Sequence, residues 1–169
     1  LRETSRAEVA ALIYQALVAI GQENPLSCSY IVKPETEIPS FCDIVGHWAE
    51  PFIRALVGMN LIQGFADGTF QPDEGMTRAQ YTALIVAAFN PAAKRPSPEF
   101  TDIPKDFWAA RAIEIAARGG FVGGFSDRTF RQEQKVQRLQ IIVSLVNGLG
   151  LSATNQKTLV YKDQNKIPE

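Results

Sequence analysis

The sequence predicts an all-α fold made of tandem helix–loop–helix repeats. Two observations lead to this prediction: the chain repeats itself, and the apolar residues of each copy recur with helical spacing. A segment that begins at Phe41 returns in altered form from Phe100. The matched residues stand a constant 60 positions apart: Trp48 and Trp108, Gly64 and Gly124, Asp67 and Asp127, Phe70 and Phe130, Arg78 and Arg138. Such copies bury their apolar faces against one another, so the sequence predicts an array.

The first predicted helix of each copy begins at a tryptophan. Apolar residues recur at helical spacing from Trp48 and again from Trp108, which indicates an amphipathic helix in each copy. These helices are expected to end near Asn60 and at Gly119-Gly120. Because both tryptophans lie on the apolar faces, we expect them to pack in the core, with stacking against a sugar as the alternative.

A tight turn and a capped second helix follow. The pair Asp67-Gly68 favours a turn, and Pro72 stops a helix from continuing through the loop. The second helix begins with a capping box, in which the side chains at the first and fourth positions pair with amides of the opening turn. The pattern is present twice: Thr77 with Gln80, and Ser5 with Glu8.

Partial copies flank the two longer ones. Residues 5–17 match residues 77–89 at an offset of 72, and residues 161–168 resemble the opening at Phe100. We therefore expect the chain to be part of a longer protein, or its first repeat to have lost its leading half. The expected organisation is the second half of a first repeat (1–22), an inserted loop (23–40), a complete repeat (41–90), a proline-rich linker (91–99), a degenerate repeat (100–151), and a linker with the start of a possible further repeat (152–169).

Two cysteines lie on either side of the inserted segment. The connection before Phe41 is 13 residues longer than the connection before Phe100. A disulfide between Cys28 and Cys42 would close this longer loop and would fit an oxidising compartment. A buried free thiol at each position is the alternative.

Composition and charge argue against several classes of protein. Hydrophobic residues make up 46% of the 169 residues and charged residues 21%, which is enough for a packed core. A formal net charge of −1 gives no broad basic field and argues against nucleic acid as a partner. No apolar run is long enough to span a bilayer. We expect no cofactor, and His47, the only histidine, has no partners for a triad or a multi-histidine metal site.

Four motifs follow one another in the complete copy. They read Phe41-x-Asp43, His47-Trp48-Ala49, Gly64-Phe65-Ala66-Asp67-Gly68-Thr69-Phe70-Gln71-Pro72 and Thr77-Arg78-Ala79-Gln80. In this order they resemble the S-layer homology (SLH) repeat. The resemblance covers nearly all of the chain apart from the inserted loop and the proline-rich linker.

The resemblance implies a non-catalytic anchoring module. SLH domains hold exported proteins to cell-wall polysaccharides, often glycans with pyruvate ketals, or to peptidoglycan-linked polymers. Three repeats usually associate as a pseudo-threefold helical bundle with sugar sites in the grooves between adjacent repeats, and the arginine of the second helix is a central contact. The implied partner is a wall glycan, with other envelope subunits as further partners. The implied location is extracytoplasmic, at the cell surface, in the wall or in the periplasm.

The chemistry of Arg78 fits such a ligand. Arg78 follows the predicted cap Thr77 at a helix start, where free amides and the helix dipole favour an anion. A guanidinium binds a carboxylate through two parallel hydrogen bonds, and a pyruvate ketal places one carboxylate on an otherwise neutral sugar. Arg6 and Arg138 occupy the same position in the other copies. Solvated surface arginines are the alternative.

The remaining candidate ligand residues each have a structural alternative. Asp43 and Asp102 precede a helix, where a cap or turn role is expected and ligand contact is the alternative. Asp67 is expected to shape its turn. Gly64 and Gly124 are expected to allow either a positive φ or the close approach of a sugar.

The second copy departs from the motif pattern. Three replacements matter: Gln137 for the capping threonine, Arg128 for the turn glycine and Gln132 for the loop proline. We expect a groove built on this copy to bind weakly, so the predicted importance falls from Arg78 to Arg6 to Arg138.

Two other hypotheses stand beside the wall anchor. One is a self-associating scaffold of an envelope layer, and the other is a glycan-cleaving enzyme, for which no motif selects a pair of carboxylates.

Overall fold

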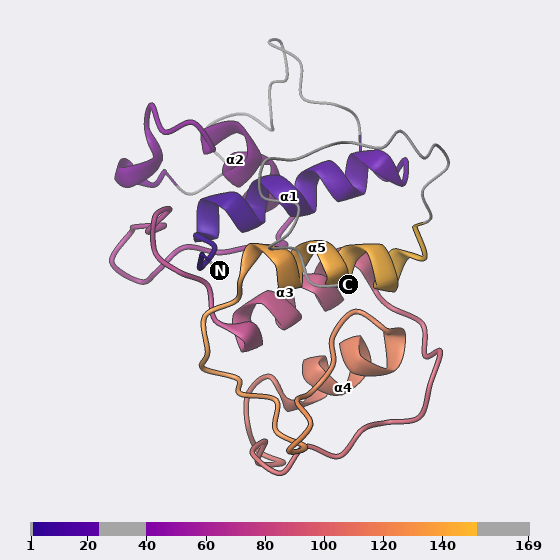
Figure 1. Ribbon diagram of the computed structural model, residues 1–169. Helices are drawn as coiled ribbons and strands as arrows, with labels where there is room; N and C mark the ends of the chain where they lie inside the picture. Colours follow the sequence, from indigo (N-terminus) through magenta and orange to yellow (C-terminus); the bar gives the residue numbers. More distant parts are fainter. Residues whose placement is uncertain (1, 24–39, 152–169) are drawn as a thin grey trace.

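The computed structural model describes residues 2–23 and 40–151, which form a helical fold (Figure 1). In chain order the elements are α1 (Arg6–Ala19), the 3₁₀ turn η2 (Cys42–Ile44), α2 (Glu50–Gly58), α3 (Arg78–Phe89), α4 (Ala110–Gly119) and α5 (Arg138–Leu149). The described residues contain no β-strand, so the predicted all-α class is confirmed. The helices α1, α3 and α5 are the predicted second helices, and α2 and α4 are the predicted first helices.

The second helices begin where the capping pattern predicts. The Ser5 hydroxyl accepts a hydrogen bond from the Glu8 amide at 3.3 Å, and the Thr77 hydroxyl accepts one from the Gln80 amide at 3.2 Å. The reverse bonds, from the amides of Ser5 and Thr77 to the side chains of Glu8 and Gln80, are also present. Because each box satisfies two amides that a helix start leaves unpaired, both starts are fixed by local sequence.

Helices pair between copies of the repeat. The helix α1 packs against α2, and α3 packs against α4, so the second helix of one copy lies beside the first helix of the next (Figure 1). The helix α5 lies near α3 in the middle of the molecule. The helix–loop–helix order of the sequence is therefore correct, while the packed helix pair spans two repeats.

Three backbone segments meet in a closed ring just before the second helices. The Thr4 amide donates to the Val136 carbonyl at 3.0 Å, the Val136 amide to the Met76 carbonyl at 2.9 Å, and the Met76 amide to the Thr4 carbonyl at 3.3 Å. All three residues are buried. The ring joins the starts of α1, α3 and α5. A pseudo-threefold arrangement of whole repeats remains a prediction.

The loops contribute large side chains to the core. Phe70 and Phe130 are fully buried although neither lies in a helix. Each contacts the aromatic residue that opens its copy, with ring centres 5.8 Å apart for Phe41 and Phe70 and 5.3 Å apart for Phe100 and Phe130. Since an aromatic side chain buries a large apolar area, these contacts hold the loops against the helices.

The two tryptophans are not core residues, contrary to the expectation from sequence. Trp48 is 58% exposed and Trp108 is 64% exposed. The helices α2 and α4 begin two residues later than predicted, at Glu50 and Ala110, so each tryptophan lies in the preceding turn. The buried face begins one position further on, at the alanine that follows each tryptophan. The helical spacing does not hold in this turn, so the assignment of both indoles to the buried face is wrong.

Two predictions concern segments outside the described residues. One is the start of a possible further repeat within residues 152–169, and the other is the bond between Cys28 and Cys42, since Cys28 is not described. Cys42 lies in η2 and is exposed. A buried thiol is therefore wrong at Cys42, and the disulfide remains a prediction.

Candidate functional site

Arg78 lies at the junction between two copies of the repeat. Its side chain comes from the start of α3, yet its Nε donates to the Phe130 carbonyl at 2.8 Å and its Nη2 to the Gly123 carbonyl at 2.9 Å, both in the following copy. The guanidinium carbon lies 4.5 Å from the Phe130 ring centre and 5.2 Å from the Phe125 ring centre. Only 8% of Arg78 is exposed, so it is not a solvated surface residue.

Arg6 repeats this geometry one copy earlier. Its Nε donates to the Phe70 carbonyl at 2.9 Å and its Nη2 to the Gln63 carbonyl at 3.1 Å. The guanidinium lies over the rings of Phe65 and Phe70, and 6% of the residue is exposed. Arg138 differs, because 59% of its side chain is exposed and its nearest carboxylate, that of Glu8, is 3.9 Å away.

The amides at the start of α3 are not free to bind an anion, which corrects the expectation from sequence. The Arg78 amide donates to the Gln134 carbonyl at 2.9 Å, and the Ala79 amide donates to the Gln132 carbonyl at 3.0 Å. The hydroxyl of the capping residue Thr77 accepts a hydrogen bond from the Gln80 amide. The helix dipole remains, but the direct amide contacts that a helix start can give to an anion are occupied by the following copy.

Burial lowers the pKa of both buried arginines, and a neighbouring cation, Arg131, acts on Arg78 alone. Burial lowers the pKa of Arg78, Arg131 lowers it further, and Asp102 partly offsets both effects. At Arg6, burial again lowers the pKa, and Asp43 offsets it. Arg131 is itself paired with Asp127 at 3.0 Å, so part of this neighbouring positive charge is balanced within the loop.

Asp43 and Asp102 hold the loops in place. The carboxylate of Asp43 accepts hydrogen bonds from the amides of Phe70, at 2.9 and 3.0 Å, and Gln71, at 2.7 Å. Asp102 makes the matching bonds to Phe130 and Arg131 at 2.7 Å each. The predicted turn role is therefore observed, but in the loop of the same copy and not at a helix start. Contact of either aspartate with a ligand stays a prediction.

Asp67 shapes its turn as predicted. Its carboxylate accepts from the Thr69 amide at 2.9 Å and from the Thr69 hydroxyl at 2.7 Å, and these bonds lower its pKa. Gly68 follows with φ of +81°, which glycine adopts without strain. The equivalent position in the second copy is Arg128, with φ of +61°. The turn geometry is thus kept where the glycine is lost.

Gly64 and Gly124 serve a purpose that the sequence did not reveal. A Cβ on Gly64 would lie 2.1 Å from the Phe41 ring, and a Cβ on Gly124 would lie 2.4 Å from the Phe100 ring. Neither glycine has a positive φ, so that expectation is wrong. Both allow the aromatic opening of their copy to lie against the loop backbone. The approach of a sugar to either glycine remains a prediction.

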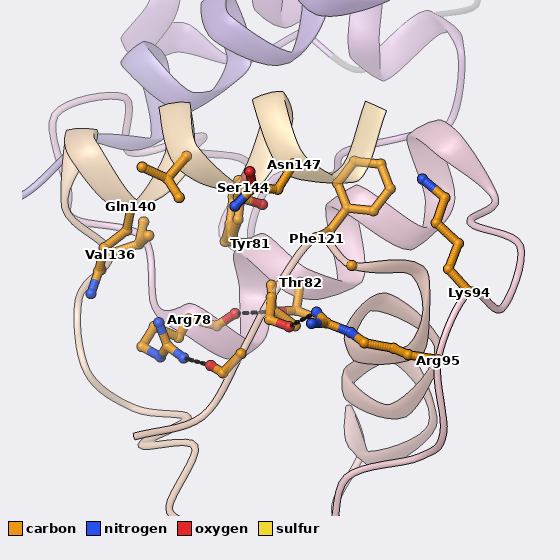
Figure 2. Close-up of a pocket in the computed structure, with 14 residues that line it drawn as sticks. Arg78, Tyr81, Thr82, Lys94, Arg95, Phe121, Val136, Gln140, Ser144 and Asn147 are labelled. Atoms are coloured by element: carbon orange, nitrogen blue, oxygen red, sulfur yellow. Dashed lines mark hydrogen bonds between the residues drawn. The ribbon is translucent and has the colours of Figure 1, made fainter. Parts of the chain in front are cut away.

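A groove of about 550 Å³ opens between α3 and α5, and we call it the α3–α5 groove (Figure 2). Arg78 lies on one side and the connecting segment with Lys94 and Arg95 on the other. Polar side chains between them come from both helices: Thr82, Gln140, Ser144 and Asn147. No aspartate or glutamate is among the described residues that line the groove.

A second groove, which we call the Trp48 groove, has a different character. Its volume is about 450 Å³, and Trp48 and the cap residue Ser5 line it. Three carboxylates and one guanidinium also line it: Glu3, Glu8, Asp73 and Arg2. An exposed indole beside hydroxyl and carboxyl groups can stack against a sugar ring, but this acidic lining does not suit an anion.

The structure brings together part of the predicted site. Arg78 meets the loop that contains Gly124 and is held by Asp102, while Trp108 is exposed beyond the start of α4. Thr77 is occupied as a helix cap. Sequence reasoning missed Lys94 and Arg95, which lie in the proline-rich linker. The Lys-Arg pair was the available signal, but only the fold shows that the linker passes the groove.

Two classes of site find no support in the part of the chain that the structure describes. Within residues 2–23 and 40–151, no helix is long and apolar enough to cross a membrane. In the same ranges, no group of three or more histidine, cysteine or acidic side chains is placed to hold a metal ion.

Comparison with known proteins agrees with this architecture. Residues 40–82 and 99–141 each match the S-layer homology domain family, and together the matches cover just over half of the chain. The chain belongs to the S-layer homology family. In this SLH chain each match runs from the aromatic opening of a copy into its second helix.

Similar proteins include anchoring, surface-layer and enzyme chains. The cellulosome-anchoring protein of Acetivibrio thermocellus is 29% identical over 94% of this chain and 35% of its own length. The S-layer protein EA1 of Bacillus anthracis is 33% identical over 82% of this chain and 16% of that protein. The endo-1,4-beta-xylanase A of Thermoanaerobacterium saccharolyticum is 34% identical over 50% of this chain and 7% of the enzyme.

These matches define the SLH chain as a module of the cell envelope. The chain spans about a third or less of each of these relatives, so the likeness is to one part of each. The xylanase resembles it through its SLH region and not through most of its length. Family membership and the anchoring and S-layer relatives indicate a cell-surface anchoring module.

Proposed function

We propose that this SLH chain is a non-catalytic anchor that binds an acidic cell-wall polysaccharide, such as a pyruvylated polymer or a peptidoglycan-linked glycan, in the α3–α5 groove. The observation that carries the proposal is the lining of this groove, which combines the guanidinium of Arg78 with neutral polar side chains and contains no acidic residue among those described. A cation in a partly desolvated groove attracts a carboxylate more strongly than the same cation in water.

The groove also offers the hydrogen-bonding groups that a sugar needs. The exposed amide of Asn147 can both donate and accept hydrogen bonds, and the Gln140 amide keeps its NH2 as a donor while its oxygen accepts from the Gln137 amide at 3.1 Å. The Thr82 hydroxyl donates to the Arg78 carbonyl at 2.7 Å and is buried. Of the five N–H groups of Arg78, those on Nε and Nη2 bind carbonyls of the next copy. The others remain for a carboxylate, so the buried arginine both joins two repeats and binds the ligand.

Two substitutions on α5 test the site without disturbing buried groups. Val143 lines the groove and is 47% exposed, whereas its neighbour Ile142 is 43% exposed and does not line it. We expect Val143→Trp to fill the groove and to lower co-sedimentation with purified wall material at least about ten-fold, while Ile142→Trp keeps wild-type binding. Failure of the wild-type chain to sediment with walls that carry the polymer would refute the anchor.

Chemical treatment of the wall tests the acidic group. Removal of pyruvate from the polymer is expected to abolish sedimentation of the wild-type chain. Unchanged binding to treated walls would show that Arg78 does not recognise a ketal carboxylate. Incubation with wall glycans is expected to release no reducing ends, because the proposed module is an anchor and not a hydrolase.

A scaffold role is the second candidate, and one surface favours it. Ile142, Val146 and Leu151 are 43%, 40% and 46% exposed, respectively, on and just beyond α5. Exposed apolar side chains that gather on one helix are typical of protein contacts. This candidate predicts self-association in sedimentation velocity that Ile142→Glu with Val146→Glu removes and that added glycan does not change. A monomer at all concentrations would contradict it.

A further inference from the structure

We propose that the α3–α5 groove accepts a ligand with two negative charges, one bound at Arg78 and the other at Lys94 and Arg95. The ligand class is an acidic oligosaccharide with a second anionic group, either a phosphate or a uronate, beside the first carboxylate. This inference rests on the proposed function and makes it narrower, because a single pyruvate ketal would satisfy only one end of the groove.

Lys94 and Arg95 are fixed at the groove by the ends of two helices. The Lys94 ammonium donates to the Gly148 carbonyl in the last turn of α5 at 2.7 Å. Arg95 Nε donates to the Ala117 carbonyl in α4 at 2.5 Å, and its Nη2 donates to the Val122 carbonyl at 3.0 Å. The backbone amides of both residues donate to the Arg118 carbonyl. These bonds hold the linker against α4 and α5, so the charged groups of Lys94 and Arg95 have defined positions.

These bonds leave donors for an anion. An ammonium has three N–H groups, and one of them binds Gly148. A guanidinium has five, and the two bonds of Arg95 leave the others for a ligand. Both side chains are exposed on the groove wall, so an anion can reach them without displacing the helix contacts.

The three cations have no acidic partner in the groove. Lys94, Arg95 and Arg78 all line it, and the described lining residues include no carboxylate. Asp102 partly offsets the lowered pKa of Arg78, but its effect is smaller than that of Arg131. Like charges that share a concave surface repel one another and concentrate anions there. A ligand with one charge leaves most of this repulsion in place, and a ligand with two charges relieves more of it.

Within residues 2–23 and 40–151, the junction at Arg6 has no counterpart of these linker cations. The described segment that follows α1 ends in Gly21, Gln22 and Glu23 and contains no lysine or arginine. At the position of Arg131 the complete copy has Gln71. Among the described residues, the two linker cations are therefore found only at the groove of Arg78, and they do not follow from the repeat pattern alone.

The test compares three soluble probes by isothermal titration at low salt. They are a pyruvate ketal of a methyl hexoside, the same sugar with a phosphate, and a disaccharide of the same sugar with a uronic acid. We expect at least one doubly charged probe to bind about ten-fold tighter than the singly charged probe, with the preference weakening as salt rises. The probe that shows the preference identifies the second anion.

A matched pair of variants assigns the effect to the groove. Lys94→Gln with Arg95→Gln is expected to reduce the preference to about two-fold while leaving the affinity for the singly charged probe nearly unchanged. Lys105→Gln with Arg111→Gln removes the same charge from exposed positions outside the groove and is expected to keep the preference. If Lys94 and Arg95 act only as caps of α5 and α4, their replacement lowers the melting temperature and the preference remains, which overturns the inference.

The remaining outcomes separate this inference from the proposed function. Binding of the singly charged probe with no gain from a second charge overturns the two-charge site and leaves the anchor in place. Equal loss of the preference in both double variants attributes it to net charge and also overturns the site. Absence of binding to every probe together with absence of wall sedimentation refutes both proposals.

Discussion

Arg78 has an observed structural role beside its proposed role in ligand binding. Its guanidinium bridges the carbonyls of Gly123 and Phe130 while its carbon lies over the Phe130 ring. Arg78, which the SLH motif predicts to bind the ligand, therefore also joins one repeat to the next. Any test of binding by removal of Arg78 therefore measures stability as well.

Replacing Arg78 by alanine is expected to destabilise the fold. The change leaves two carbonyls without their donor and removes the contact with the Phe130 ring, which together cost about 2–4 kcal/mol. Arg138→Ala is the control, since its exposed side chain should contribute within about 0.5 kcal/mol. Urea unfolding followed by circular dichroism measures both. Equal midpoints for the two variants would mean that Arg78 does not join the repeats.

Gly64 is expected to tolerate no side chain, because the Phe41 ring occupies the space. A methyl group there would lie 2.1 Å from the ring and would force Phe41 or the loop to move, at a cost of about 1–3 kcal/mol. Gly123 is the matched control, because a Cβ at Gly123 meets nothing within 4 Å. Thermal unfolding of Gly64→Ala and Gly123→Ala should separate the two. A stable Gly64→Ala protein would show that the ring has room.

An aspartate–threonine pair stabilises the turn of each loop, and the second copy adds an arginine to it. Asp127 accepts from the Thr129 hydroxyl at 2.6 Å and from the Thr129 amide at 3.0 Å, and Arg131 donates to its other oxygen at 3.0 Å. These bonds favour the charged carboxylate. They lower the pKa of Asp127 from its ordinary value of 3.8 to about 2, with the Thr129 hydroxyl as the largest cause.

The loop is therefore expected to lose stability only in strong acid. Because the pKa of Asp127 is lower in the folded chain, its contribution is complete above pH 3.8 and disappears as pH falls through about 2. Thr129→Val removes the largest cause and should raise the pKa of Asp127 towards 3.8. Carboxyl chemical shifts followed over pH measure both proteins. A titration near 3.8 in the wild-type chain would contradict the bonding described here.

Local sequence was enough to predict the helices. The position of the site residues depends on contacts between segments that are distant in the sequence. The starts of α1 and α3 follow from Ser5 and Thr77, whose hydroxyls bind an amide three residues away. The exposure of Trp48 was missed because the spacing of apolar residues continues into the turn before α2. The linker cations were missed because their position beside Gly148 depends on where the chain passes α5.

The repeat of the sequence differs from the folded unit of the molecule. The sequence copy from Phe41 joins α2 to α3, but α3 packs against α4, and Arg78 binds the loop that follows α4. A unit that begins before α3 and ends after that loop contains the helix pair, the arginine and both of its carbonyl partners. The sequence copy contains α3 and Arg78 without those partners.

This difference leads to a prediction for two fragments of equal length. Residues 75–135 hold α3, α4 and the contacts of Arg78, and residues 41–101 hold one sequence copy and its linker. We expect fragment 75–135 to show a helical circular dichroism spectrum and a thermal transition that Arg78→Ala weakens. Fragment 41–101 is expected to be largely unfolded, because neither of its helices retains its packing partner. Equal helical signal from both fragments, or no effect of Arg78→Ala on 75–135, would show that the sequence copy folds as a unit and that Arg78 does not close the pair.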